Sequence, residues 1–310
     1  MNKNIIRIGT RGSQLALYQA SLAKKLLLEK FPEVIVEITI IKTKGDKILD
    51  VALSKIGDKG LFTKELETAL LENEVDIAVH SLKDLPTTLP EGLKLGAVLE
   101  RGEFRDALVC KNGRNLSELT ENDVIATSSL RRQAGLLRHN KNFKIVDIRG
   151  NVETRLRKME DGYCDAMIMA AAGLQRLNLE KYITEIIDPE VIIPATSQGV
   201  IAIESRNDDN RIDSFLSEIN HQVTWKAIEA ERGFLRKIEG GCQVPVGCFT
   251  KTDGNSISIT GFVAAIDGTE YLSDSETGLL ENAGPTGIKL AEKLIAKGAG
   301  RILSDIRQQH

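Results

Sequence analysis

The sequence predicts an α/β protein with two doubly wound domains and a smaller α+β domain at the C-terminal end. Strand-like and helix-like segments alternate over the first two thirds of the chain, the pattern of largely parallel sheets covered by helices. After about residue 220 the order changes to one helix, three strand-like segments and a closing helix. A chain of 310 residues also exceeds one ordinary core, so two or three domains are expected.

The first domain is predicted to take residues 1–99 together with 200–219. Its early part holds three apolar strand-like segments separated by two helix-like ones. VIAIESR and DDNRIDSFLSEIN arrive after the second domain is complete, which indicates that the chain crosses back. The expected strands are 5–9, 34–42, 76–80 and 200–206, and the expected helices are 13–30, 60–74 and 208–220.

The second domain, residues 100–199, repeats the alternation, and the third, residues 220–310, does not. In the third domain Asp253-Gly254 and Asp267-Gly268 are strong hairpin signals, which predict an antiparallel sheet. The second domain should have strands at 124–128, 143–150 and 165–173 and helices at 130–139 and 151–162; the third, helices at 225–239 and 287–303 and strands at 246–251, 256–266 and 270–275.

Composition limits the function classes. The N-terminus has no apolar leader and no later run approaches a membrane span, so we expect a cytoplasmic protein with no membrane partner. Cys110, Cys164, Cys242 and Cys248 form no CxxC motif, and with four scattered histidines they give no zinc spacing. We therefore expect free thiols and no metal.

The charge is distributed unevenly. The net charge is −3, yet residues 127–158 hold nine Lys or Arg against two acidic side chains, a local +7. Such a field attracts nucleic acid or small polyanions. Phe143 is the only aromatic residue in that window, which gives no stacking surface for single strands. Small anionic ligands are favoured, and no nucleic acid partner is expected.

Three strand ends carry the candidate anion-binding residues. Ser and Thr at a helix start are favoured N-caps, and such junctions also bind anions through free N–H groups and the helix dipole. Capping alone is the alternative, but it does not require neighbouring arginines, whose guanidinium groups bind carboxylates in bidentate fashion. The candidates are Arg11 and Ser13 after the first strand, Ser129, Arg131 and Arg132 in VIATSSLRRQA, and Arg149 and Arg155 around DIRGN.

One acid and one thiol are candidates for chemistry. Asp84 in HSLKDLP follows an expected strand beside Lys83, although an Asp before a proline is as often a turn residue. His80, within the apolar strand, is interpreted as a packed histidine. Cys242 lies in the glycine-rich loop IEGGCQVPVG, where a thiolate favoured by a positive field would suit covalent bond formation.

Several enzyme classes find no support. The sequence shows no Ser-His-Asp or Cys-His arrangement and no Rossmann fingerprint. KIGDKGLFTKE indicates a mobile basic flap around Lys59, and it lacks the P-loop spacing. A non-catalytic receptor for small anions remains an alternative, because two α/β lobes around a cleft also describe solute-binding proteins. Such a receptor needs the arginines but neither Asp84 nor Cys242.

Seven motifs in consistent order carry a resemblance to a known family. They are IRIGTRGSQLAL, KGLFTKELE, AVHSLKDLPT, ATSSLRRQA, IRGNVETRL, AAAGLQRL and EGGCQVPVG, and they span nearly the whole chain. Together they resemble the porphobilinogen deaminase (hydroxymethylbilane synthase) family. The resemblance implies a monomeric transferase of porphyrin and heme biosynthesis that condenses four porphobilinogen molecules into the linear tetrapyrrole hydroxymethylbilane and releases ammonia. It also implies two lobes like those of periplasmic binding proteins around a cleft.

The resemblance also implies a cofactor and residue roles. A dipyrromethane made from the substrate would be attached to Cys242 by a thioether. Asp84 would assist departure of the substrate amine, stabilise the cation that follows and manage the loss of a proton, since a carboxylate suits a cationic transition state. The family positions that hold the carboxylate side chains of the cofactor correspond to Lys83, Ser129, Arg131 and Arg132. Those that bind the substrate or the growing chain correspond to Arg11, Ser13, Arg149, Arg155 and Arg176. Lys55 and Lys59 fit a flap over the cleft, with Phe62 near the pyrrole rings.

Four segments depart from the family pattern. Glu103-Phe104 stands where Asp-Pro is usual, Asp58 where Gly is common and Gly233 where Ala is common, and PATSQGVIAIE is a variant of the more typical glutamine-glycine segment. A glycine within a helix costs about 1 kcal/mol relative to alanine. The remaining cysteines, Cys110, Cys164 and Cys248, are expected to pack in the interior.

Overall fold

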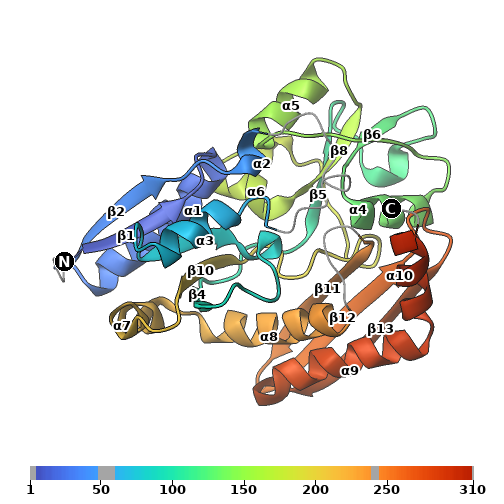
Figure 1. Ribbon diagram of the computed structural model, residues 1–310. Coiled ribbons are helices and arrows are strands. Elements are labelled where there is room, and N and C mark those ends of the chain that lie inside the picture. Colours follow the sequence, from blue (N-terminus) through green and yellow to red (C-terminus); the bar gives the residue numbers. More distant parts are fainter. Residues whose placement is uncertain (1–4, 48–59, 239–243, 309–310) are drawn as a thin grey trace. The chain divides into compact units, whose positions relative to one another are not determined.

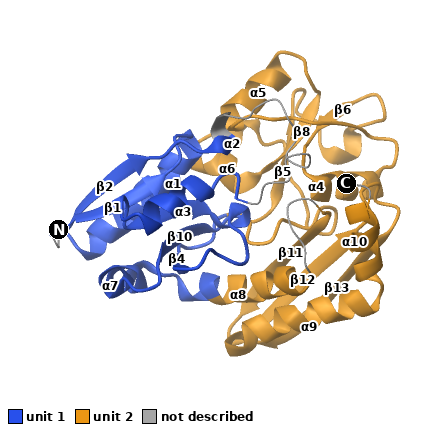
Figure 2. Ribbon diagram, viewed as in Figure 1, with its two compact units in different colours: residues 1–49, 58–102, 199–225 blue, residues 50–57, 103–198, 226–310 orange. Residues whose placement is uncertain are grey.

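The computed structural model describes residues 5–47, 60–238 and 244–308 (Figure 1). The chain divides into two compact units (Figure 2). The first unit takes residues 1–49, 58–102 and 199–225, and the second takes residues 50–57, 103–198 and 226–310. Within the residues that the structure describes, the chain passes between the units after residues 102, 198 and 225.

The sheet of the first unit contains the strand that crosses back. Strand β1 pairs in parallel with two neighbours, whereas β10 is antiparallel to both of its partners. The prediction that residues 200–206 return to the first sheet is confirmed. In spatial order the strands are β2 (Ile35–Ile40), β1 (Ile5–Thr10), β3 (Ile77–Ser81), β10 (Ile201–Arg206) and β4 (Leu93–Val98).

Helices of the first unit form where apolar residues recur at helical spacing. Ala20, Ala23 and Leu27 on the first helix are fully buried against the sheet, because residues three and four apart share one helix face. The helical elements are α1 (Gln14–Lys30), α2 (Lys44–Lys47), α3 (Lys64–Leu71), the 3₁₀ helix η2 (Leu82–Asp84) and α7 (Asn210–Ile219).

The first sheet of the second unit repeats this topology. Strand β6 is parallel to β7 and β8, and β5 is antiparallel to β8 and β9. In both sheets the antiparallel strand is the first one formed after the chain enters the unit from the other. The strands in spatial order are β7 (Lys144–Val146), β6 (Val124–Ala126), β8 (Ala166–Ala170), β5 (Asp106–Cys110) and β9 (Glu185–Ile186).

The helices beside that sheet follow the expected segments with one difference. The predicted strand at 165–173 ends at Ala170 and the chain continues directly as a helix. The elements are η3 (Leu116–Glu118), α4 (Leu130–His139), α5 (Val152–Glu160), α6 (Ala171–Arg176) and η4 (Glu180–Tyr182).

The last part of the second unit is a three-stranded antiparallel sheet. Gly254 and Gly268 adopt φ values of 53° and 71° in its two turns, which confirms the predicted hairpins. The predicted single closing helix is two helices, because Gly298 takes a φ of 104° between them. The elements are α8 (Gln222–Lys237), β11 (Val246–Asp253), β12 (Ser256–Ala264), β13 (Tyr271–Leu279), η5 (Leu280–Asn282), α9 (Ala283–Ala296) and α10 (Ala299–Gln308).

The antiparallel sheet is held to the rest of the second unit by aromatic and cationic contacts. Phe104 stacks on Phe249 with ring centroids 5.5 Å apart, and the Arg138 guanidinium carbon lies 4.0 Å from the Tyr271 ring centroid. The observed topology confirms the predicted fold class of two doubly wound α/β sheets with a small antiparallel sheet. None of the helices within the described residues combines the length and the apolar character needed to cross a membrane.

Candidate functional site

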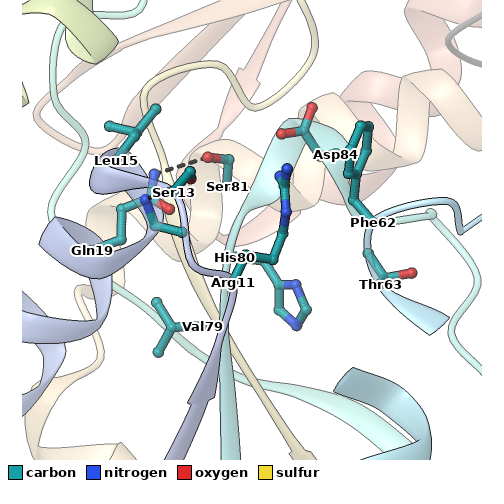
Figure 3. Close-up of a pocket in the computed structure, with 11 residues that line it drawn as sticks. Arg11, Ser13, Leu15, Gln19, Phe62, Thr63, Val79, His80, Ser81 and Asp84 are labelled. Carbon is teal, nitrogen blue, oxygen red and sulfur yellow. Dashed lines mark hydrogen bonds between the residues drawn. The ribbon is translucent and has the colours of Figure 1, made fainter. Parts of the chain in front are cut away.

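A pocket in the first unit brings together four residues that the sequence predicted for the site. Arg11, Ser13, Phe62 and Asp84 line a cavity of about 80 Å³. Figure 3 shows their side chains with those of neighbouring pocket residues. The remaining lining residues are Leu15, Ala16, Gln19, Thr63, Val79, His80 and Ser81.

Arg11 lies directly after β1 and against an aromatic ring. Its guanidinium carbon is 4.2 Å from the Phe62 ring centroid, a cation–π contact that fixes the plane of the guanidinium. Ser13 is the N-cap of α1, and its Oγ accepts a hydrogen bond of 3.3 Å from the Ala16 amide. The capping that was the alternative for Ser13 is thus present, and Arg11 is the stronger candidate for binding an anion.

Asp84 is presented by a short 3₁₀ turn at the end of β3. Leu82 anchors this turn because its side chain is buried and its amide donates to the Val200 carbonyl at 3.0 Å. The Asp84 side chain is exposed, while Lys83 beside it is half-buried and does not line the pocket. The structure therefore offers a carboxylate at the pocket edge on a rigid strand end.

His80 belongs to the buried side of the same strand. Its side chain is 4% exposed, and Nε2 lies 3.1 Å from Oε2 of the fully buried Glu204. In Figure 3 the imidazole points away from the Asp84 carboxylate. The interpretation of His80 as a packed histidine agrees with this burial.

Arg131 and Arg132 form a buried cluster around Asp106 in the second unit. Both guanidinium groups bond to this fully buried carboxylate, at 2.8 Å from Arg131 Nη1 and 2.7 Å from Arg132 Nη2. Burial alone would raise the pKa of Asp106, but the two positive charges outweigh it and hold the pKa far below the usual range. Burial lowers the pKa of Arg131, and Asp106 opposes that shift.

Four further candidates, three after strand ends and one at a helix end, belong to the same unit as this cluster. Ser129 caps α4 and its Oγ accepts from the Arg132 amide at 3.5 Å. Arg149 and Arg155 lie around Gly150, whose φ of 120° turns the chain into α5. Arg155 donates to the Gly150 carbonyl at 2.8 Å, and burial lowers the pKa of Arg149. Arg176 ends α6 and is half-buried.

The predicted site residues thus fall into two sets. Arg11, Ser13, Phe62, Lys83 and Asp84 belong to the first unit, and the second set belongs to the second unit. The second set is Ser129, Arg131, Arg132, Arg149, Arg155 and Arg176. Cys242, Lys55 and Lys59 lie outside the described residues. Within residues 5–47, 60–238 and 244–308, no group of three potential metal ligands is placed to hold an ion.

Sequence reasoning missed Asp106 and Gln198. The Gln198 amide nitrogen donates to Asp106 and to the Phe104 carbonyl, each at 2.9 Å. One signal was present for Asp106, because it is an acidic residue at the head of the otherwise apolar strand Asp106–Cys110. A charge in that place needs a buried partner. No comparable signal marked Gln198.

Two residues that depart from the family pattern, Glu103 and Phe104, make contacts within the second unit. Glu103 receives hydrogen bonds from the Arg105 side chain, and Phe104 stacks on Phe249 of the antiparallel sheet.

The cysteines within the described residues are packed in the interior. Cys110, Cys164 and Cys248 are buried free thiols, and burial raises the pKa of Cys164 to about 11.

Comparison with known proteins finds one family over both units. The model of the porphobilinogen deaminase dipyrromethane cofactor binding domain matches residues 6–214, and that of the porphobilinogen deaminase C-terminal domain matches residues 225–296. Porphobilinogen deaminase from Syntrophomonas wolfei subsp. wolfei is 49% identical over 98% of this chain and 99% of its own. The Desulforamulus reducens protein of that name is 48% identical over 98% and 99%, respectively.

Solved structures give only weak likenesses. The BenM effector binding domain with benzoate covers 69% of this chain and 90% of its own, at 19% identity and a TM-score of 0.43. The aliphatic sulphonate binding protein SsuA from Escherichia coli covers 76% and 71%, at 14% identity and a TM-score of 0.42. These values are too low to bear on function.

Proposed function

Since the chain belongs to the porphobilinogen deaminase family, we propose that it condenses four porphobilinogen molecules into hydroxymethylbilane, with Asp84 as the catalytic carboxylate. The chain is thus a transferase of tetrapyrrole synthesis, and porphobilinogen is its substrate. The observation that carries the residue assignment is the pocket of the first unit, which Asp84 shares with Arg11 and Phe62.

The pocket has the groups that this substrate requires. Porphobilinogen carries an aminomethyl group, an acetate and a propionate on one pyrrole ring. Arg11 supplies a guanidinium for a carboxylate, and Phe62 supplies an aromatic face beside it. Asp84 supplies the single negative charge among the side chains that line the pocket within the described residues. An ammonium leaving group and the cation formed when it departs are both stabilised by such a charge.

Asp84 is assigned the proton transfers of each addition. As the amine departs, positive charge spreads over the pyrrole, and the carboxylate stabilises it electrostatically. After the new carbon–carbon bond forms, the ring carbon that reacted must lose a proton, and the Asp84 carboxylate is the base that accepts it. Exposure of Asp84 to solvent allows that proton to leave afterwards.

The basic cluster of the second unit fits the dipyrromethane that the family binds. Arg131 and Arg132 form a buried, positively charged donor set, and Ser129 lies two residues before Arg131, so carboxylate groups suit this place. We assign to these residues and to Lys83 the carboxylates of the cofactor, and to Cys242 its thioether. When bound, the dipyrromethane supplies the primer to which substrate units are added. Arg149, Arg155 and Arg176 are assigned to the substrate or the growing chain, as is Ser13, and Lys55 and Lys59 to a flap.

We propose further that the chain acts as a monomer in the cytoplasm. We also propose that the chain has three domains, formed by residues 1–99 with 200–219, by residues 100–199 and by residues 220–310. The change of pattern after about residue 220 supports the boundary of the third domain.

Substitution of Asp84 by Asn tests the catalytic assignment. Turnover of porphobilinogen should fall by about 10² to 10⁴, the usual contribution of a positioned acid or base, while porphobilinogen still binds. Glu91→Gln removes the same charge from an exposed position outside the pocket and should retain turnover. An Asp84→Asn enzyme with full turnover would refute the role of Asp84, and a wild-type chain that binds porphobilinogen without turnover would favour the anion receptor.

A further inference from the structure

Asp106 is the centre of a hydrogen-bonded cluster that holds two arginines in fixed positions. Arg131 donates through Nη1 to Oδ2 at 2.8 Å, and Arg132 donates through Nη2 and Nε to Oδ1 at 2.7 and 3.2 Å. Gln198 adds a fourth bond to Oδ1 at 2.9 Å. Asp106 is 0% exposed, and the two arginines are 5% and 8% exposed. All three side chains are therefore ordered by one another and shielded from solvent.

The charges of this cluster do not cancel. A guanidinium stays protonated in proteins, so the two arginines carry two positive charges. Asp106 is the only carboxylate within ion-pair distance of either arginine among the described residues. The further bonds of Arg131 and Arg132 go to the neutral carbonyls of Ile193 and Ile168. One positive charge thus remains in a buried place, where an unbalanced charge is unfavourable.

Gln198 keeps this residual charge at one. Its amide bridges the Phe104 carbonyl and Asp106 and so supports the carboxylate without adding a charge. A single anionic group would complete the cluster, whereas two would leave it with a net negative charge.

We propose that Asp106 is a positioning residue that fixes Arg131 and Arg132 and lowers their joint charge to +1, so that the pair accepts one carboxylate group of the covalent primer. This inference rests on the proposed function. It assigns to Asp106 a role in charge balance that differs from ordinary packing, and the difference can be measured.

The test is a double-mutant cycle of Asp106→Asn and Arg131→Gln. Asp106→Asn leaves two adjacent buried guanidinium groups without their carboxylate. Arg131→Gln leaves a neutral Arg132–Asp106 pair. The double variant returns the net charge to +1 through Arg132 alone. Each protein is purified as expressed, its covalent cofactor occupancy is read by intact mass, and its unfolding midpoint is measured in urea.

Charge balance predicts compensation. Each single variant should lose at least about tenfold in occupancy, and the double variant should exceed both in occupancy and in unfolding midpoint. The matched control is Asp123→Asn with Arg114→Gln, an ion pair nearer the surface of the same unit, which should leave occupancy unchanged. If Asp106→Asn does not fold, a folded double variant with measurable occupancy still supports the inference.

Three outcomes would overturn the inference. They are an Arg131→Gln variant that is loaded as fully as wild type, a double variant no better than the worse single variant, and a double variant that fails to fold. Failure of the proposed function itself is distinguishable, because then the wild-type protein would neither carry the dipyrromethane mass nor acquire it from porphobilinogen or hydroxymethylbilane.

Discussion

The crossing of α8 and α9 predicts that alanine gives no gain in stability at either of two glycines and a large loss at one of them. A Cβ atom at Gly233 would lie 2.9 Å from the Gly284 carbonyl oxygen. At Gly287, on the facing helix, a Cβ atom would lie 1.9 Å from the Ala230 carbonyl oxygen. Both obstacles are backbone atoms, which cannot rotate away as a side chain would. The close packing of these helices therefore explains a glycine at 233 where the family commonly has alanine.

The magnitude follows from two opposing effects. Alanine gains about 1 kcal/mol over glycine in a helix interior, and overpacking a tight contact costs about 1–3 kcal/mol. At Gly233 the contact is only slightly too short, so Gly233→Ala should destabilise by roughly 0–2 kcal/mol. At Gly287 the atoms would be about 1.5 Å short of ordinary contact, and the helices must separate. Gly287→Ala should therefore lose more than about 3 kcal/mol.

Urea unfolding of the three glycine variants provides the assay. Gly300→Ala is the control, because Gly300 lies in α10 with no atom within 4 Å of the added Cβ. This variant should gain up to about 1 kcal/mol. The expected order of stability is Gly300→Ala, wild type, Gly233→Ala and Gly287→Ala. A Gly233→Ala protein stabilised as much as Gly300→Ala would show that the crossing is not tightly packed and would refute the reasoning.

Two further predictions concern the second unit. Glu231 on α8 is fully buried and accepts hydrogen bonds from the Ser197 amide at 2.6 Å and from the Thr250 amide at 3.0 Å, so Glu231→Gln should place an amide donor against a donor and destabilise the protein by about 1–3 kcal/mol. Glu229→Gln, at a half-exposed ion pair on the same helix, should change stability by less than about 1 kcal/mol. Equal urea midpoints for the two variants would contradict this prediction. Burial raises the pKa of Cys164 from 9.0 to about 11, so at pH 8 only about one thiol in a thousand is ionised. Alkylation of Cys164 in the native protein should therefore be about a hundredfold slower than alkylation of a thiol of pKa 9.0. Since the folded state keeps this proton while the unfolded state loses it, Cys164 also lowers stability as the pH rises from 9 towards 11. Rapid labelling of native Cys164 at pH 8, followed by peptide mapping, would contradict the assigned burial effect.

The sequence predicted the parts of the fold that depend on local signals. Asp253-Gly254 and Asp267-Gly268 predicted the hairpins because glycine at a positive φ defines such turns. The strand pattern at 200–206 and the helix pattern after it predicted that the chain crosses back, because both arrive after the second domain is complete. The break at Gly298 was missed because an isolated glycine also occurs within helices.

The sequence predicted the site residues whose type is required for binding an anion. It did not predict their ion-pair and hydrogen-bond partners, which come from distant segments of the chain. Arg131 and Arg132 were candidates because they begin a helix after a strand. Their ion pairs with Asp106, and the support of Asp106 by Gln198, join three segments that are far apart in the sequence. The pairing of both β5 and β6 with β8 and the path of residues 193–198 bring these groups together. No pattern within one segment specifies such contacts.

The central claim is that this chain builds a tetrapyrrole on a dipyrromethane attached to Cys242. The most direct test is the intact mass of the denatured wild-type protein, with peptide mapping around Cys242 and a Cys242→Ser variant beside it. We predict an added mass equal to two linked porphobilinogen units on the Cys242 peptide and none in the variant. A wild-type chain that is unmodified, and stays so after incubation with porphobilinogen or hydroxymethylbilane, would contradict the claim.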